Sequence, residues 1–232
     1  MAVTGQIIAD KVEILLQDET NVRWTEAELL GWINSGQREI AIAKPNALTS
    51  NTTMQLTASA TKQTIPATGI QLMEVIRNMG ADGLTPGRAI TGIDRSVLDG
   101  TIPTWHSDAN AGGAVKHFTF DPRDPKTFYV YPKAPATALY VELIISINPT
   151  QLASMASNIA YDDIYETMLI DYVLYRAYGK DSKHTSNMQR AAAHYQAFQN
   201  ALGLKSRGEM MISPVQQFGA GVPAQPSDGG TT

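Results

Sequence analysis

The chain has 232 residues, of which 43% are hydrophobic, and this is enough for one good core with an appended arm. Its 18 Lys and Arg against 22 Asp and Glu give a net charge of −4, so it lacks the basic excess of proteins that grip phosphate backbone. It has no cysteine, which excludes disulfides, thiolate zinc sites and cysteine nucleophiles. No secretion signal is visible, and no apolar run approaches the roughly 20 residues that span a bilayer, so we expect no membrane partner.

Two helices are expected at the start of the chain. Residues 4–17 have apolar side chains at helical spacing, namely Ile7, Ile8, Val12 and Leu15. Thr25, followed three residues later by Glu28, forms a capping box that predicts a second helix over 26–43. The sequence Lys44-Pro45-Asn46 ends this helix, because the residue before a proline avoids the helical conformation.

The region 51–150 changes to β patterning with long loops. Residues 52–57 and 62–65 are typical of short extended pieces, whereas 72–79 fits a strand or a helix. Residues 80–116 are rich in Gly, Ala and Asp and predict mostly loop, with one short helix near 94–98. A Pro-rich turn joins 117–120 to 128–131, which predicts a hairpin, and the β-branched stretch 139–147 predicts a third strand beside it.

The chain then returns to helix. Residues 161–178 and 185–202 predict two helices, ended by Gly179 and Gly203. The first is apolar nearly all round, which indicates either a central helix or a subunit interface rich in tyrosine. On the second reading the interface candidates are Tyr165, Tyr172, Tyr175 and Arg176.

The order of the elements predicts an α+β fold. A helical bundle is formed by the N-terminal helices in 1–50 and the C-terminal helices in 151–204, and the β-rich segment 51–150 is an insertion that projects from it.

Residues 205–232 are rich in Gly, Pro, Gln and Ser and show no helical or strand period. Such a segment buries too little apolar surface to offset the entropy of ordering it, so we expect a partner to hold it as an extended C-terminal arm. Fully extended, the arm would reach up to roughly 90 Å. Its apolar side chains are the expected anchors: Met210, Met211, Ile212, Val215, Phe218 and Val222.

The titratable residues lack the spacing of a catalytic or metal site. Asp162, Asp163 and Glu166 form an acidic cluster that fits a carboxylate pair or a cation site, but acids are also favoured in the first turn of a helix by its dipole. Asp171 is expected to pair with a base such as Arg176 or one on another subunit. The four histidines are scattered, and no phosphate-loop or nucleophile motif is present. We therefore predict no catalytic residue, no cofactor and no metal.

Three parts of the chain carry a resemblance to a known family. They are TEAELLGWINSGQREIA (25–41), DPRDPKTFYVYP (121–132), and YDDIYETMLIDYVLYRAYGKDS leading into RAAAHYQAFQNALG (161–182 and 190–203). In this order, over about a third of the chain, they resemble the adaptor, or head-to-tail connector, proteins of tailed bacteriophages. The resemblance implies a ring, typically a dodecamer, that docks beneath the portal of the capsid. It also implies a helical bundle around a DNA channel, a β part that faces the tail or neighbours, and a C-terminal arm that reaches onto the portal or adjacent subunits.

The partners that the resemblance implies are the portal protein, copies of the chain itself, tail or nozzle proteins, and double-stranded DNA that passes without specific binding. It places the protein at the head–tail interface of the virion, after assembly in the host cytoplasm. The acidic balance suits such a conduit, because an inner wall without a basic track does not hold the duplex.

Three alternatives stay open. One is a tail-completion or tail-tube ring of the same channel. The second, from another class, is a phage hydrolase that uses the acidic cluster. The third, disfavoured by charge, is a nucleic-acid-binding module.

Overall fold

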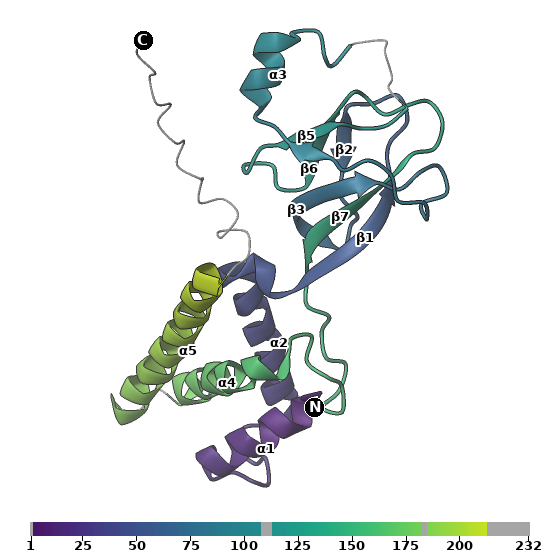
Figure 1. Ribbon diagram of the computed structural model, residues 1–232. Helices are drawn as coiled ribbons and strands as arrows, with labels where there is room; N and C mark the ends of the chain where they lie inside the picture. Colours follow the sequence, from purple (N-terminus) through teal and green to yellow (C-terminus); the bar gives the residue numbers. More distant parts are fainter. Residues whose placement is uncertain (1, 108–112, 182–184, 213–232) are drawn as a thin grey trace, which may run out of the picture.

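A computed structural model of the chain describes residues 2–107, 113–181 and 185–212, with side chains up to Lys205. Figure 1 shows a helical lobe that contains α1, α2, α4 and α5, and a β lobe that contains the strands and α3. The chain enters the β lobe after the 3-10 turn η1 (Pro45–Ala47) and leaves it after β7. This confirms the predicted α+β fold, in which helices from both ends of the chain pack together and the strands lie between them in sequence.

The two N-terminal helices are α1 (Gly5–Leu16) and α2 (Glu26–Ala43), as predicted. The capping box is present: the Thr25 hydroxyl accepts the backbone N–H of Glu28 at 3.4 Å, and the Glu28 carboxylate accepts the backbone N–H of Thr25 at 3.1 Å. These two bonds satisfy donors that a helix N-terminus would otherwise leave unpaired. The local sequence therefore determines where α2 begins.

The central helix of the bundle is α4 (Glu166–Lys180), which follows the 3-10 turn η2 (Asp163–Tyr165) and packs against α1, α2 and α5. Its all-round apolar pattern is therefore that of a central helix. The approach to α2 is close: a Cβ added at Gly36 would lie 2.9 Å from a ring carbon of Tyr172 and 3.0 Å from a methyl carbon of Leu169.

The last helix, α5, runs over Thr185–Ile212, so the predicted end at Gly203 is wrong. Glycine costs a helix interior only about 1 kcal/mol relative to alanine, and tertiary contacts outweigh that here. Leu202 is buried in the bundle core, and the Lys205 ammonium lies 4.0 Å from the centroid of the Tyr165 ring. Residues 205–212, which the sequence predicts to be part of an extended arm, are consequently helical.

Side chains on α2 receive the chain as it returns from the β lobe. The Asn34 amide oxygen accepts the backbone N–H of Leu152 at 2.8 Å, and its amide nitrogen donates to the Leu152 carbonyl at 3.2 Å. One turn further on, the buried Gln37 accepts the backbone N–H of Ala160 at 2.7 Å. Two amides thus bind a segment more than 110 residues away in sequence.

The β lobe holds two small sheets around one core. In the first sheet, β7 (Tyr140–Ile147) lies between β1 (Thr49–Gln55) and β3 (Gly69–Asn78), antiparallel to both. The second sheet has the order β2 (Lys62–Thr64), β6 (Thr127–Tyr131), β5 (His117–Phe120) and β4 (Thr91–Gly92). The predicted hairpin is confirmed as β5 and β6, and the ambiguous stretch 72–79 is a strand.

The prediction that 139–147 lies beside the hairpin is wrong. The free edge of β6 is occupied by β2, and β7 is instead the central strand of the other sheet. A central strand suits this stretch because Val141, Leu143 and Ile145 alternate into the core and are at most 1% exposed.

Part of the region 80–116 is packed rather than loose. The predicted short helix is α3 (Arg95–Thr101), capped by Asp94, whose carboxylate accepts the Ser96 N–H at 2.8 Å. After α3, Trp105 is fully buried and its indole N–H donates to Asp99 at 2.8 Å. An isolated tryptophan in a Gly-rich stretch was the available signal for this packing.

Candidate assembly surfaces

The acidic cluster at the start of α4 is divided among separate structural roles. Glu166 forms an ion pair with Lys11 of α1, which joins the first helix to the central one. Asp162 occupies the N-cap position of η2 without a side-chain capping hydrogen bond, and it is exposed. Within the described ranges, no three acidic or histidine side chains come together in an arrangement that could hold a metal ion. The cluster thus shows the arrangement of helix-end acids rather than that of a paired active site.

Asp171 has a different partner from the predicted Arg176. Its carboxylate lies 2.9 Å from Nδ1 of His194 on α5. The His194 ring also stacks on Tyr178, with ring centroids 5.7 Å apart. Asp171 and Arg176 are five residues apart on one helix and so project from different sides of it, whereas α5 lies against the Asp171 side.

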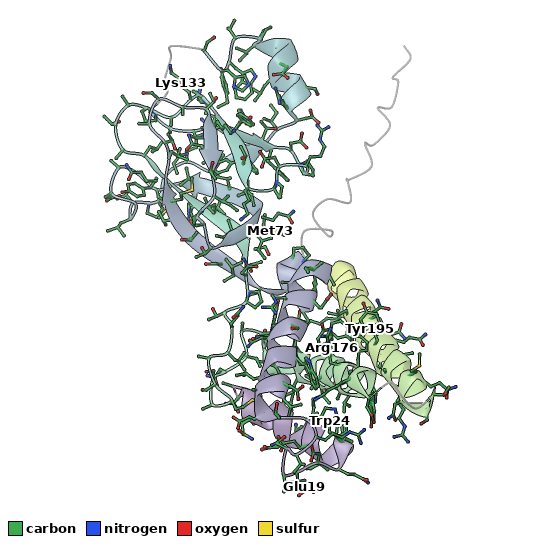
Figure 2. All side chains as sticks on the ribbon, turned by 180° about the vertical axis from the view of Figure 1, so that it is seen from behind. Glu19, Trp24, Met73, Lys133, Arg176 and Tyr195 are labelled. Carbon is green, nitrogen blue, oxygen red and sulfur yellow. The ribbon has the colours of Figure 1, made fainter. Side chains whose placement is uncertain are left out.

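The predicted interface candidates on α4 divide into a buried and an accessible pair. Tyr165 and Tyr172 are 2% and 3% exposed and belong to the core of their own bundle. Tyr175 is half-buried and its ring packs against Tyr195 of α5, with centroids 4.8 Å apart. Arg176 is exposed, and Figure 2 shows it in the helical lobe near Tyr195. Only Tyr175 and Arg176 are therefore placed to meet another molecule without a change in the bundle.

A shallow hollow of about 490 Å³ on the helical lobe contains both accessible candidates. Its other lining residues come from two helices: Glu28 and Trp32 of α2, and Gly179 and Lys180 of α4. The Lys180 ammonium donates to the Glu28 carboxylate at 2.7 Å, so one rim of the hollow is an ion pair. Sequence reasoning missed Trp32 and Glu28 here because they join Arg176 only through the packing of α2 on α4.

The β lobe carries a second hollow, of about 570 Å³. It lies where β4 ends beside β5, and it is lined by Phe118, Phe120 and Tyr129 together with polar residues of the neighbouring turns. The Arg123 guanidinium on its rim donates to Asp121 at 2.6 Å and holds the pKa of that carboxyl at about 2. None of the sequence-predicted site residues lies in this hollow.

The predicted anchors of the C-terminal arm fall on both sides of the end of α5. Met210, Met211 and Ile212 lie in its last turn. Val215, Phe218 and Val222 lie outside the described residues. The helix therefore carries the chain up to Ile212 before any arm can begin.

Three exposed large apolar side chains lie at the end of the bundle opposite the β lobe. Ile14 and Leu15 at the end of α1 are 63% and 56% exposed, and Val22 in the following turn is 81% exposed. Figure 2 shows Glu19, from the same turn, at that end of the molecule. Among the helices in the described part of the chain, none combines the length and the hydrophobicity that a membrane crossing requires.

Comparison with known proteins assigns this architecture to a family. The model of the SU10 adaptor protein family matches residues 4–218, which span the helical lobe, the β lobe and the segment just beyond α5. A comparison with curated proteins found no match. The matched range begins at the N-cap of α1 and extends past the end of α5, so it takes in both lobes described above. The chain therefore belongs to the SU10 adaptor protein family, a family of phage adaptor proteins.

Proposed function

We propose that this protein is the head-to-tail adaptor of a tailed phage virion. In this role, copies of the chain form a ring beneath the portal, extend the DNA channel and offer a docking surface to tail or nozzle proteins. The observation that carries the proposal is the family match over residues 4–218, because it covers both lobes rather than one motif. The work of such a protein is assembly, with no turnover.

The distribution of accessible features supports two separate attachment regions. On the helical lobe, the hollow around Tyr175 and Arg176 combines aromatic surface with paired charges, which is typical of an interface that is wet at its rim. At the far end of the same lobe, Ile14, Leu15 and Val22 offer apolar surface. A ring subunit needs two different contact surfaces, since each copy must meet its neighbour head to tail.

The charge balance supports passage of DNA without retention. The chain has 18 basic against 22 acidic side chains, and a protein that neutralises many phosphates needs a local excess of Lys and Arg. We expect the dissociation constant for duplex DNA at physiological salt to lie in or above the range of ordinary non-specific binding, roughly 10⁻⁶ to 10⁻⁴ M. A tight, strongly salt-dependent affinity would favour the nucleic-acid-binding module instead.

The test is attachment to the portal. Because α5 runs to Ile212, the informative truncation removes residues 213–232 and leaves every described helix whole. The full chain, mixed with portal protein, should form a larger ring complex in size measurements, and the truncated chain should bind the portal less while keeping its helical circular dichroism. No change in size when the full chain and portal are mixed would contradict the proposal.

Imaging of the virion distinguishes an adaptor beneath the portal from a ring protein that lies further down the same channel. Labelled protein should lie directly beneath the portal along the head–tail axis of the virion. A signal confined to the tail tube or to the lower end of the tail would identify a tail-completion or tail-tube ring.

A further inference from the structure

β1 is an edge strand, and within the described part of the chain its composition and pairing lack the features by which proteins usually protect an edge. Its seven residues, TSNTTMQ, contain no charge and no proline, and its pairing with β7 runs without interruption from Thr49 to Gln55. The other outer strand of this sheet, β3, differs: its pairing has three register shifts, and residues 87–90 hydrogen-bond along its far side. Long, regular and uncharged edges are templates for pairing with another strand.

The pairing register shows which backbone groups of β1 face outward. The Leu56 N–H donates to the Leu139 carbonyl at 2.9 Å, and at the other end the Ile147 N–H donates to the Leu48 carbonyl at 3.1 Å. Since hydrogen-bonded positions alternate along an antiparallel ladder, the even-numbered residues of β1 bond β7. The N–H and C=O groups that point away from β7 are consequently those of Thr49, Asn51, Thr53 and Gln55.

A hydrogen-bonded turn that packs on the side chains of Tyr140 of β7 and Thr53 of β1 carries an exposed apolar side chain. Leu84 is 79% exposed, and its neighbour Gly83 lies next to Thr53 of β1, with 3.5 Å from an added Cβ to the threonine methyl. The Asp82 carboxylate accepts the backbone N–H groups of Leu84 and Thr85 at 2.9 and 3.0 Å, and the Thr85 hydroxyl at 2.8 Å. An exposed leucine in a hydrogen-bonded turn one residue from Gly83 thus offers an apolar contact point near Thr53, whose outward backbone groups have no hydrogen bond to any other described residue.

The sequence after α5 contains one segment that matches this edge. Residues 215–222, VQQFGAGV, lie between Pro214 and Pro223 and carry no charge. In an extended conformation Phe218, Ala220 and Val222 would share one face, because side chains alternate along a strand. Eight residues also suit a seven-residue edge in length. The segment thus offers both the backbone groups that β1 can pair and apolar side chains for Leu84.

We propose that residues 215–222 of one copy add as a strand to the open edge of β1 of a second copy, with the Phe218 face against Leu84. This inference rests on the proposed ring, in which a head-to-tail contact joins each copy to the next. Only two residues separate Ile212 from the segment, so the neighbour's β1 edge lies within roughly 10 Å of the end of α5. Strand addition of this kind takes its affinity from main-chain bonds and its specificity from side chains.

The absence of cysteine from the chain makes a direct cross-linking test possible. Equal amounts of a Leu84→Cys chain and a Phe218→Cys chain are mixed and treated with a short bis-maleimide, and the cross-linked dimer is measured over a range of concentrations. The matched control replaces Leu84→Cys by Val97→Cys, a half-exposed position on α3. We expect at least about tenfold more dimer from the Leu84→Cys mixture, because strand addition raises the local concentration of the pair.

Substitutions at the edge test the mode of binding. Thr53→Pro removes an outward N–H without breaking the ladder to β7, and Thr53→Lys places a charge on the edge; both should reduce the cross-link to the level of the Val97→Cys control. The second variant keeps the test decisive if the first does not fold, and Met73→Lys on β3 is the charge-matched control that should leave the cross-link intact.

Two results would overturn the inference. One is a dimer yield no higher than that of the Val97→Cys control at every concentration. The other comes from a further chain that carries both Leu84→Cys and Phe218→Cys: a cross-link that forms only within that single chain. Portal attachment is measured separately. A persistent cross-link without portal binding would remove the proposed function, whereas portal binding without the cross-link would remove only this inference.

Discussion

The helical lobe and the β lobe are held together in different ways. The helical core joins α1 and α2 to α4 and α5, so residues from the first 50 positions pack against residues beyond 150. The β core is built from one continuous segment of the chain, between Met54 and Ile147. The helical core can therefore be completed only after the residues of the β lobe have been synthesised. All residues of the β core, in contrast, lie within one stretch of the chain. We therefore expect the two lobes to lose stability separately, although one chain passes through both.

The largest effect is expected from a cavity in one core. Leu169→Ala removes a fully buried side chain from the centre of α4 and should cost about 2–5 kcal/mol of unfolding free energy. Hydrogen exchange measured by mass spectrometry should show lost protection in α1, α2 and α4 while β1 and β7 keep theirs. Leu143→Ala in β7, equally buried, should give the reverse pattern. Equal loss in both lobes from either variant would show that the two cores unfold as one unit.

A smaller effect is expected from the two buried glutamines, one in each lobe. Gln37→Leu leaves the Ala160 N–H without its acceptor, and Gln63→Leu does the same to the Thr57 N–H, which the Gln63 amide oxygen accepts at 2.7 Å. Each loss should cost about 0.5–1.5 kcal/mol, because a part-buried backbone N–H loses the hydrogen bond to its buried glutamine partner. Chemical denaturation followed by a separate probe in each lobe should show that Gln37→Leu lowers the stability of the helical lobe and that Gln63→Leu lowers that of the β lobe. Gln6→Leu on exposed α1 surface is the control and should change little.

Acid should weaken both lobes through one ion pair in each. The Lys180 ammonium lowers the pKa of Glu28 below its usual 4.5 in the helical lobe, and the Arg77 guanidinium lowers the pKa of Glu142 below 4.5 in the β lobe. A lowered pKa in the folded state stabilises the fold above pH 4.5, and this contribution is lost as the pH falls through the folded-state value. Glu28→Gln should therefore flatten the acid side of the melting curve of the helices, and Glu142→Gln that of the strands. Melting temperatures measured from about pH 7 to pH 3 check this. If the variants lose melting temperature with falling pH as steeply as the parent chain, other carboxylates cause most of the acid destabilisation.

The smallest effect on stability is expected at exposed arginines. Arg176→Ala on α4 and Arg123→Ala, whose side chain is 90% exposed on the β lobe, should each change the unfolding free energy by at most about 0.5 kcal/mol. Their comparison separates assembly from folding. If the hollow around Arg176 is a subunit contact, Arg176→Ala should reduce ring formation on the portal while the single chain melts as before. Normal ring formation would remove Arg176 from the interface candidates.

Local signals predicted the helix starts better than the helix ends. The capping box at Thr25 and Glu28 determines the start of α2 because both partners lie within one turn. The end of α5 depends on contacts with residues far away in sequence, among them the Tyr165 ring that Lys205 covers, and so a glycine signal at 203 was misleading. The same reason applies to β7, whose neighbours β1 and β3 are more than 60 residues away in sequence.

Assembly surfaces were harder to predict than elements. The apolar pattern of α4 correctly indicated burial on several sides, but a pattern does not distinguish a helix buried by its own chain from one buried by a neighbour. Tyr165 and Tyr172 lie inside the bundle, whereas Tyr175 and Arg176 face a hollow completed by Trp32. The sequence did not predict that β1 is an edge strand, because the position of a strand in a sheet depends on which other strands pair with it.

Sequence patterns alone were sufficient for the capped start of α2 and the hairpin of β5 and β6, because each depends on residues close together in the chain. They were also sufficient for the α+β class and the family resemblance, which need only the order of such local patterns. The expectation that residues 205–232 need a partner stays a prediction. Three features became known from the packing of the chain: α4 is central, β7 belongs to a different sheet from the hairpin, and α5 continues to Ile212. These outcomes are set by burial against distant segments, which outweighs local propensity wherever a core has to be filled.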